Sequence, residues 1–367
     1  MQIIRNTEKQ VIERTLARLV LAAGLLAACT PAPTPSPTVA PAQIDLSGIK
    51  TYLLDKVGSL KSATSALSAE ADRYYELAKA NEFDYAALWA SRADEAKQLI
   101  GAGREAWKVA SPLYEQVEGI VAGTPSLSEF DVILDAGASG AEDPEGAAPF
   151  DLTLPDGRVL SRPGNLFGVT EATLWGTFAE FAAPVAADWD GDGQIEFSET
   201  LPDANVLKAA AEALDRYVGD LQAAAQAWTP TESDAFTALV VMVPTMSEYF
   251  DSWKNSRFVA GEASTQRDFV AISRLADIQD ILSSLQVVHA NVSPLIVSVD
   301  AGQDAQIKQG LADLKAFVAE VHRQEQSGKR FTPEEADLLG AEAQNRATAI
   351  AGLIAQVAAK LNIQIVE

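Results

Sequence analysis

The chain has very few of the side chains that bind soft metals or carry nucleophilic catalysis. Its 367 residues include one cysteine, Cys29, and two histidines, His289 and His322. A single cysteine excludes an intramolecular disulfide framework. A zinc centre of the usual ligand types, or a Ser-His-Asp triad, has almost no residues from which to form. The composition therefore argues against conventional hydrolase chemistry.

Positive charge is also scarce. The chain has 28 Lys and Arg against 51 Asp and Glu, a formal net charge of −23. Nucleic acid is therefore excluded as a partner class, because its binding needs clustered basic residues. An acidic surface suits cations, although in many secreted proteins it serves solubility alone.

The apolar run near the N-terminus is too short to span a membrane. It covers the ten residues Leu19–Ala28, whereas a transmembrane helix needs roughly 20. It follows four basic residues and ends in small residues directly before Cys29, as in the lipobox of bacterial lipoproteins. Residues 1–28 are therefore predicted to be a lipoprotein signal peptide. The alternative is an ordinary cleaved signal peptide with an incidental thiol.

Acylation of Cys29 would anchor the protein to the bacterial cell membrane, on its extracytoplasmic side, without a transmembrane helix. Residues 29–43 contain five prolines among Thr, Ala and Ser, a composition that favours extended polyproline II. We therefore expect a Pro-rich stalk between the anchor and the folded part of the chain.

From residue 44 onward, apolar residues recur at spacings of three and four among abundant Ala, Leu, Glu, Gln and Lys. This pattern predicts an all-α fold with two antiparallel helical bundles, residues 44–202 and 203–367. The pattern breaks at residues 135–165, where two short runs flank Pro155-Asp-Gly157. These runs predict a small β-hairpin inserted into the helical frame. Long helices are expected over residues 46–80, 85–121, 205–227, 232–253, 267–296, 304–326 and 333–361.

Residues 188–199 match the calcium-binding loop of an EF-hand at every diagnostic position. Calcium takes six to eight oxygen ligands, which positions 1, 3, 5, 7, 9 and 12 of such a loop supply. Glycine at position six, here Gly193, permits the sharp turn. The predicted ligands are Asp188, Asp190, Asp192, the backbone carbonyl of Gln194, Glu196 and Glu199.

The alternative for this segment is an acidic surface loop, but its carboxylates would repel one another without a cation. Pro184 lies four residues before the loop, where a full EF-hand has an intact helix. Only one such loop is visible. A structural calcium site is therefore expected rather than a regulatory switch, with an affinity of roughly 0.1–1 mM.

Several segments resemble the imelysin-like family, which includes iron-uptake lipoproteins of the EfeO type and alginate-binding relatives. The resemblance covers roughly residues 48–363. The matching segments are Tyr114-Glu-Gln-Val-Glu118, Asp131-Val-Ile-Leu-Asp135, Phe167-Gly-Val-Thr-Glu-Ala-Thr-Leu-Trp175, Ser273–Asp277 and Phe331-Thr-Pro-Glu-Glu335. The resemblance implies two helical bundles and a metal site.

The family's metal-binding His-x-x-Glu pair is incomplete in this chain, because Gly168 occupies the histidine position. Glu171, with Glu118 and Asp277, would then form an oxygen-only site that favours a hard ion. Alternatively, Glu171 is a first-turn carboxylate that interacts with the helix dipole. Without the histidine, the peptidase activity implied by some family names is not expected.

Two functions follow as expectations. In the first, the protein captures a cation, by family implication iron, or an anionic polysaccharide through bound calcium, for delivery to a membrane transporter. In the second, it is a calcium-stabilised structural or saccharide-binding surface lipoprotein without a role in metal uptake. We expect no enzymatic activity.

Overall fold

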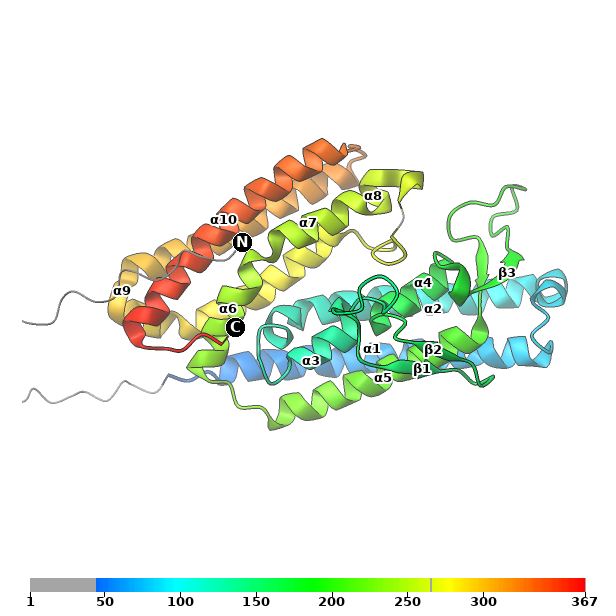
Figure 1. The fold of residues 1–367 in the computed structure, drawn as a ribbon, viewed down its shortest axis with the longest axis horizontal. Helices are drawn as coiled ribbons and strands as arrows, with labels where there is room; N and C mark the ends of the chain where they lie inside the picture. The colour runs from blue at the N-terminus through cyan, green and yellow to red at the C-terminus, as the bar shows by residue number, and fades with distance from the viewer. Residues whose placement is uncertain (1–43, 265, 367) are drawn as a thin grey trace, which may run out of the picture. The chain divides into compact units, whose positions relative to one another are not determined.

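The computed structural model describes residues 44–264 and 266–366, which belong to one compact unit (Figure 1). Helices dominate these residues, and the strands form only two small antiparallel pairs, which confirms the predicted all-α class. The predicted signal peptide, Cys29 and the Pro-rich stalk lie outside the described residues.

The first group of helices consists of α1 (Ser47–Ala80), α2 (Tyr85–Val121), α4 (Leu166–Trp175) and α5 (Ala204–Ala227). α1 packs against both α2 and α5, and α4 packs against α5. The apolar stripe of α1 is buried as its spacing predicts. The break between the two helical groups therefore comes after α5, not at residue 203, because α5 turns its apolar face toward α1.

The second group consists of α6 (Glu232–Met242), α7 (Met246–Asn255), α9 (Arg274–Gln326) and α10 (Pro333–Leu361). α10 begins at the capping box formed by Thr332 and Glu335. Short helical turns join these elements: η3 (Val243–Thr245), α8 (Arg257–Ala260) and η4 (Gly261–Ala263). The two groups meet where α2 packs against α9.

α9 consists of two helical halves joined at a sharp break. Asp300 has φ −161° and ψ 89°, which breaks the helix. The two halves lie against each other, because the carboxylate of Asp304 is 3.1 Å from Nε2 of His289 although 15 residues separate them. Two helices were predicted here, but the first begins at Arg274 rather than residue 267. Among the described residues α9 alone is long and apolar enough to span a membrane, and half of its apolar window is buried within the protein.

The predicted hairpin is present as β1 (Asp151–Thr153) paired with β2 (Val159–Ser161). Gly157 in its turn has φ +88°, a conformation that favours glycine. A second antiparallel pair was not predicted: β3 (Ala182–Ala186) and β4 (Thr200–Pro202) flank the acidic loop, and η2 (Ala179–Phe181) precedes them. The loop therefore connects two strands, not the two helices of a full EF-hand.

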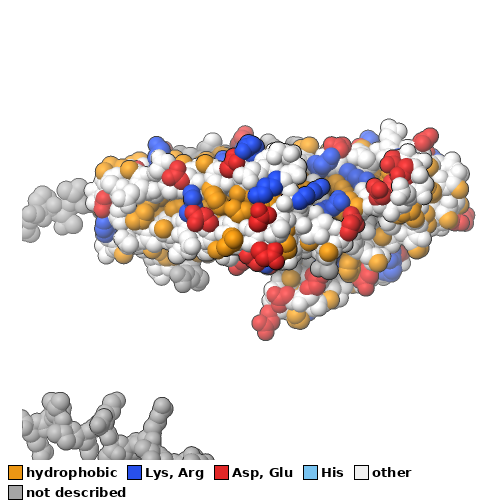
Figure 2. Space-filling model, turned by 90° about the horizontal axis from the view of Figure 1, so that it is seen from above, with side chains coloured by type: hydrophobic (Ala, Val, Ile, Leu, Met, Phe, Trp, Pro, Cys, Tyr) orange, Lys and Arg blue, Asp and Glu red, His pale blue; other side chains and the backbone are white. Residues whose placement is uncertain are grey.

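The surface carries mixed charge on the face drawn in Figure 2. Lys and Arg side chains alternate there with Asp and Glu, and hydrophobic side chains lie between them. The negative excess of the chain therefore forms no continuous acidic patch on this face.

Candidate metal centre

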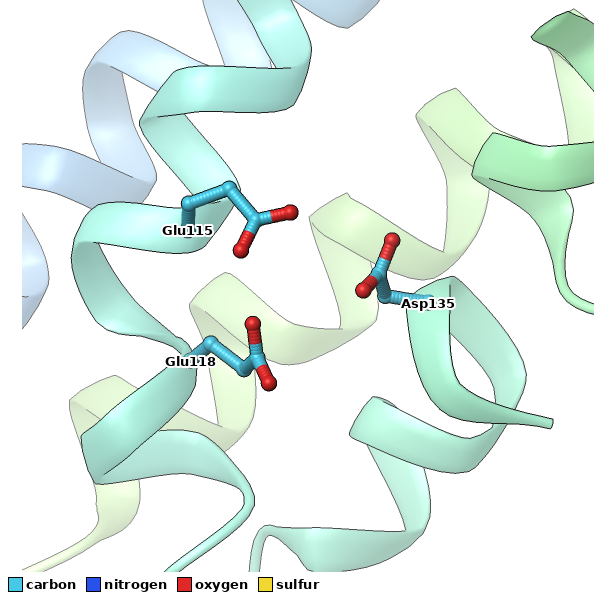
Figure 3. Close-up of side chains that lie close together, drawn as sticks. All are labelled: Glu115, Glu118 and Asp135. Atoms are coloured by element: carbon cyan, nitrogen blue, oxygen red, sulfur yellow. The ribbon is translucent and has the colours of Figure 1, made fainter. Parts of the chain in front are cut away.

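Three buried carboxylates converge where α2 faces a short helical segment. Glu115 and Glu118 lie one turn apart on α2, so their side chains share a face. Asp135 comes from η1 (Val132–Ala136), a π-helix that continues α3 (Ser128–Asp131). One oxygen from each of the three carboxylates lies within 4.8 Å of the others, and Figure 3 shows the groups directed into the same space.

Arg274, at the start of α9, is the cation of this cluster. Its Nη1 lies 3.1 Å from Oε1 of Glu115 and 3.3 Å from Oδ2 of Asp277, and its Nη2 lies 3.8 Å from Oδ2 of Asp135. The guanidinium also lies over the ring of Tyr249, at 4.7 Å. Burial lowers the pKa of Arg274, but the surrounding carboxylates, Glu115 foremost, raise it overall above its ordinary value.

The cluster contains more acidic groups than its one cation can neutralise. Five carboxyl groups are buried in it, those of Glu115, Glu118, Asp131, Asp135 and Asp277. Burial raises the pKa of Asp131 to about 7 and that of Asp277 to about 6. Burial also raises the pKa values of Glu115 and Asp135 well above the ordinary range. The site therefore favours uptake of protons or of a cation.

Hydrogen bonds satisfy only some of the carboxylate oxygens in this cluster. The hydroxyl of Tyr249 donates to Oε1 of Glu118 at 2.7 Å, and that of Tyr114 donates to Oδ1 of Asp131 at 2.7 Å. Oε2 of Glu115 and Oε2 of Glu118 have no hydrogen-bond partner among the described residues, although both side chains are at least 97% buried. Such orphaned acceptors are unfavourable in a protein interior, and a bound cation would satisfy them.

A cavity of about 400 Å³ opens beside the cluster. Its wall includes Glu118, Asp131, Asp135, Gly168, Tyr249 and Asp268. These residues come from both helical groups, so the cavity exists only where the groups meet. A water molecule occupies about 30 Å³ in the liquid, so the cavity has room for a hydrated or chelated ion.

The three residues predicted for the family site have different surroundings. Glu118 and Asp277 both belong to the cluster around Arg274. Glu171 instead accepts hydrogen bonds from three consecutive backbone N–H groups, those of Phe269 (2.7 Å), Val270 (3.0 Å) and Ala271 (2.8 Å). Burial raises the pKa of Glu171 to about 8, against the opposing effect of these donors.

Glu171 therefore anchors the segment that leads into α9. It is not a first-turn carboxylate, because it lies in the middle of α4 and its partners belong to another segment. Glu171 and Asp277 share the wall of a small adjoining cavity, not that of the main one.

Sequence reasoning missed Glu115, Asp135 and Arg274 as site residues. The spacing of Glu115 and Glu118 was a usable signal, because residues three apart share a helical face. The position of Arg274 three residues before Asp277 was a second signal. No local pattern indicated that Asp135 would meet them, since that contact joins distant segments.

The acidic loop brings three of its predicted calcium ligands together. Oxygen atoms of Asp188, Asp190 and Asp192 lie within 4.8 Å of one another. Asp188 accepts backbone N–H groups from Gly191 at 2.6 Å and Gly193 at 2.9 Å. The bond from Gly193 is the main cause that lowers the pKa of Asp188.

The end of the loop is arranged differently. The carboxylate of Glu199 is buried and accepts the backbone N–H groups of Trp189 and Glu196, both at 2.8 Å. These bonds tie the two ends of the loop together. The side chains of Gln194 and Glu196 are exposed.

Basic side chains attach the loop to the helices. Lys97 donates to the carbonyl of Trp189 at 2.9 Å, and Arg104 donates to that of Ser198 at 2.7 Å. The guanidinium of Arg257, on α8, lies 3.2 Å from the ring centre of Phe197. The loop thus contacts both helical groups.

The fold and the site together define an all-α protein of two packed helical groups with an acidic cavity at their junction. The family model described as Imelysin (Peptidase_M75) matches residues 51–359. The chain belongs to the imelysin family. A comparison with curated proteins found no match.

Proposed function

We propose that this chain is an extracytoplasmic cation-binding protein, anchored to the membrane through acylated Cys29, that captures a metal ion in the acidic cavity. The observation that carries the proposal is the group of buried carboxylates Glu115, Glu118 and Asp135, two of which keep an unpartnered oxygen. A cation at this point would neutralise buried charge and satisfy both oxygens.

The chemistry of the donors indicates the class of ion. Carboxylate oxygens suit hard cations, whereas thiolate and imidazole suit softer ones. Ferric iron is a hard cation, and iron is the ion that family membership implies. Delivery of that ion to a membrane transporter, as in the iron-uptake lipoproteins of the EfeO type, is the corresponding physiological role.

The loop 188–199 is proposed to bind calcium as a structural site. Asp188, Asp190 and Asp192 already face one another, and internal hydrogen bonds hold them. A cation there would offset their mutual repulsion. Because the loop contacts α2 and α8, bound calcium would stiffen the junction of the two helical groups.

The position of Arg274 favours a second function, in which the acidic cluster binds no metal. Its guanidinium takes up part of the negative charge of Glu115, Asp135 and Asp277, as an internal counter-ion would. In that case the metal site is silent, and the protein is a calcium-stabilised structural or saccharide-binding surface lipoprotein.

Peptidase activity is not part of the proposal. Neither histidine of the chain lines the acidic cavity: His289 lies beside Asp304, and His322 lies between Gln279 and Gln326. The cavity therefore lacks the imidazole ligands of the usual zinc peptidase centres.

Metal analysis of the purified protein, followed by calorimetric titration with calcium, iron and copper, tests the proposal. We expect a site for iron that Glu118→Gln weakens strongly and Glu129→Gln, an exposed control near the same cluster, leaves unchanged. A calcium site that depends on Glu199 should be independent of both variants. Calcium binding alone, with no iron bound by the wild type, would reject the capture function in favour of the structural one.

A further inference from the structure

Gly168 and Asp268 meet at the wall of the acidic cavity. A β-carbon built on Gly168 would lie 2.9 Å from Oδ2 of Asp268 and 3.3 Å from its Cβ. It would also lie 3.0 Å from the amide oxygen of Asn165, which caps α4. The absence of a side chain at position 168 thus leaves room for the carboxylate of Asp268.

Asp268 is held in this place by its neighbours in the chain. The three residues that follow it donate their backbone N–H groups to Glu171. Glu171 lies three residues after Gly168, on the same face of α4. One turn of α4 therefore contacts the segment 268–271 in two ways. Glu171 accepts its backbone N–H groups, and Gly168 leaves space for the side chain of Asp268.

The candidate metal ligands around the cavity are oxygen atoms, and the guanidinium groups of Arg267 and Arg274 also line it. No histidine or cysteine of the described chain lines it, while Glu118, Asp131, Asp135 and Asp268 do. Glu118, which is 97% buried and lines the same cavity, keeps Oε2 without a hydrogen-bond partner among the described residues. A bound cation would satisfy a buried acceptor of this kind.

We propose that Asp268 is a cation-binding carboxylate of this cavity and that its presence over Gly168 makes the cavity selective for hard cations. This inference rests on the proposed cation-capture function. It assigns Glu171 a positioning role, because its oxygens are used by the backbone of the segment that carries Asp268. Replacement of Asp268 by a neutral side chain should reduce affinity for hard ions more than for softer ones, since affinity for hard ions follows ligand charge.

The experiment uses the full chain in mild detergent with Asp188→Asn as background, so that the acidic loop does not bind the probe. Terbium(III) is the hard probe and copper(II) the softer one, each titrated by calorimetry. Asp268→Asn should weaken terbium binding by about tenfold or more and copper binding by less. Glu262→Gln, an exposed change in the same segment and away from the cavity, is the matched control and should change neither.

A side-chain exchange tests the selectivity directly. Gly168→His combined with Asp268→Ser supplies an imidazole and removes the carboxylate beside it. We expect this double variant to gain affinity for copper(II) and to lose affinity for terbium(III), because imidazole suits copper. Thermal unfolding of each variant identifies any that fails to fold.

The outcomes separate this inference from the proposed function. If Asp268→Asn and the double variant bind terbium as the Asp188→Asn background protein does, while Glu118→Gln abolishes binding, Asp268 is not a ligand and the capture function stands. If the protein that carries Asp188→Asn alone binds neither probe, both are overturned.

Discussion

Glu118→Gln should make the metal-free protein more stable and should reduce the stabilisation that bound metal provides. The change keeps the size of the side chain and an oxygen that accepts the hydroxyl of Tyr249. It removes one acidic group from a cluster in which five buried carboxyl groups surround Arg274. A residue placed for folding alone would show the opposite sign on stability.

The magnitude follows from the spacing of the charges. Oxygens of Glu115, Glu118 and Asp135 lie within 4.8 Å of one another. At an effective dielectric constant of about 20, each like-charge pair at that distance is unfavourable by about 3.5 kcal/mol. Attraction between Glu118 and Arg274, and protonation of neighbouring carboxyls, offset most of this. A net gain of about 1–3 kcal/mol remains, or about 2–6 °C in Tm.

Differential scanning calorimetry at pH 7.5 measures both effects. The metal-free variant, prepared with a chelator, should unfold at a higher temperature than the wild type, and the increase in Tm on adding iron should disappear. Glu129→Gln serves as the control because it removes the same charge from an exposed position. A lower Tm in the metal-free variant, or an unchanged increase with iron, would contradict the charge-excess reasoning.

Three further predictions concern the remaining features. Glu199→Gln should abolish a calcium-dependent stabilisation of about 1–3 kcal/mol at 10 mM calcium, measured by thermal unfolding, whereas the exposed control Glu180→Gln should retain it. Burial raises the folded-state pKa of Glu171 from 4.5 to about 8, so the stability linked to this group is full below pH 4.5 and falls as pH rises towards 8. Glu171→Gln should flatten that decline in urea unfolding at pH 5, 6.5 and 8, and an unchanged slope would show that the group does not titrate there. Burial lowers the pKa of His289 below 6.5, so its contribution is present above pH 6.5 and is lost as pH falls. His289→Gln should reduce the difference in stability between pH 7.5 and pH 5, and an equal difference in both proteins would refute this.

Much of the fold could be predicted because it is encoded locally. The apolar stripe of α1 and the capping box at Thr332 specify helices through neighbours three or four residues apart. β3 escaped prediction because a strand of five residues containing Pro184 has no clear alternation. The partner of α5 also could not be read locally, since its apolar face would fit either helical group.

The candidate site was only partly predictable for the same physical reason. Glu115 and Glu118 are one helical turn apart, so their proximity follows from the sequence. The contact of Arg274, on α9, with Asp135, on η1, joins residues 139 positions apart, so it depends on how these distant elements pack. The partners of Glu171 are backbone N–H groups, which any sequence possesses and which therefore leave no signal.

The π-helix η1 makes the site sensitive to the insertion or deletion of a single residue. Each turn of a π-helix holds about one residue more than an α-helical turn, and such turns recur at functional sites. Loss of one residue between Asp131 and Asp135 would restore the α-helical register and rotate Asp135 by about 100° away from Glu115 and Glu118. A single codon deletion, with no change to any acidic residue, would thus be enough to dismantle the cluster, and a single insertion to create it.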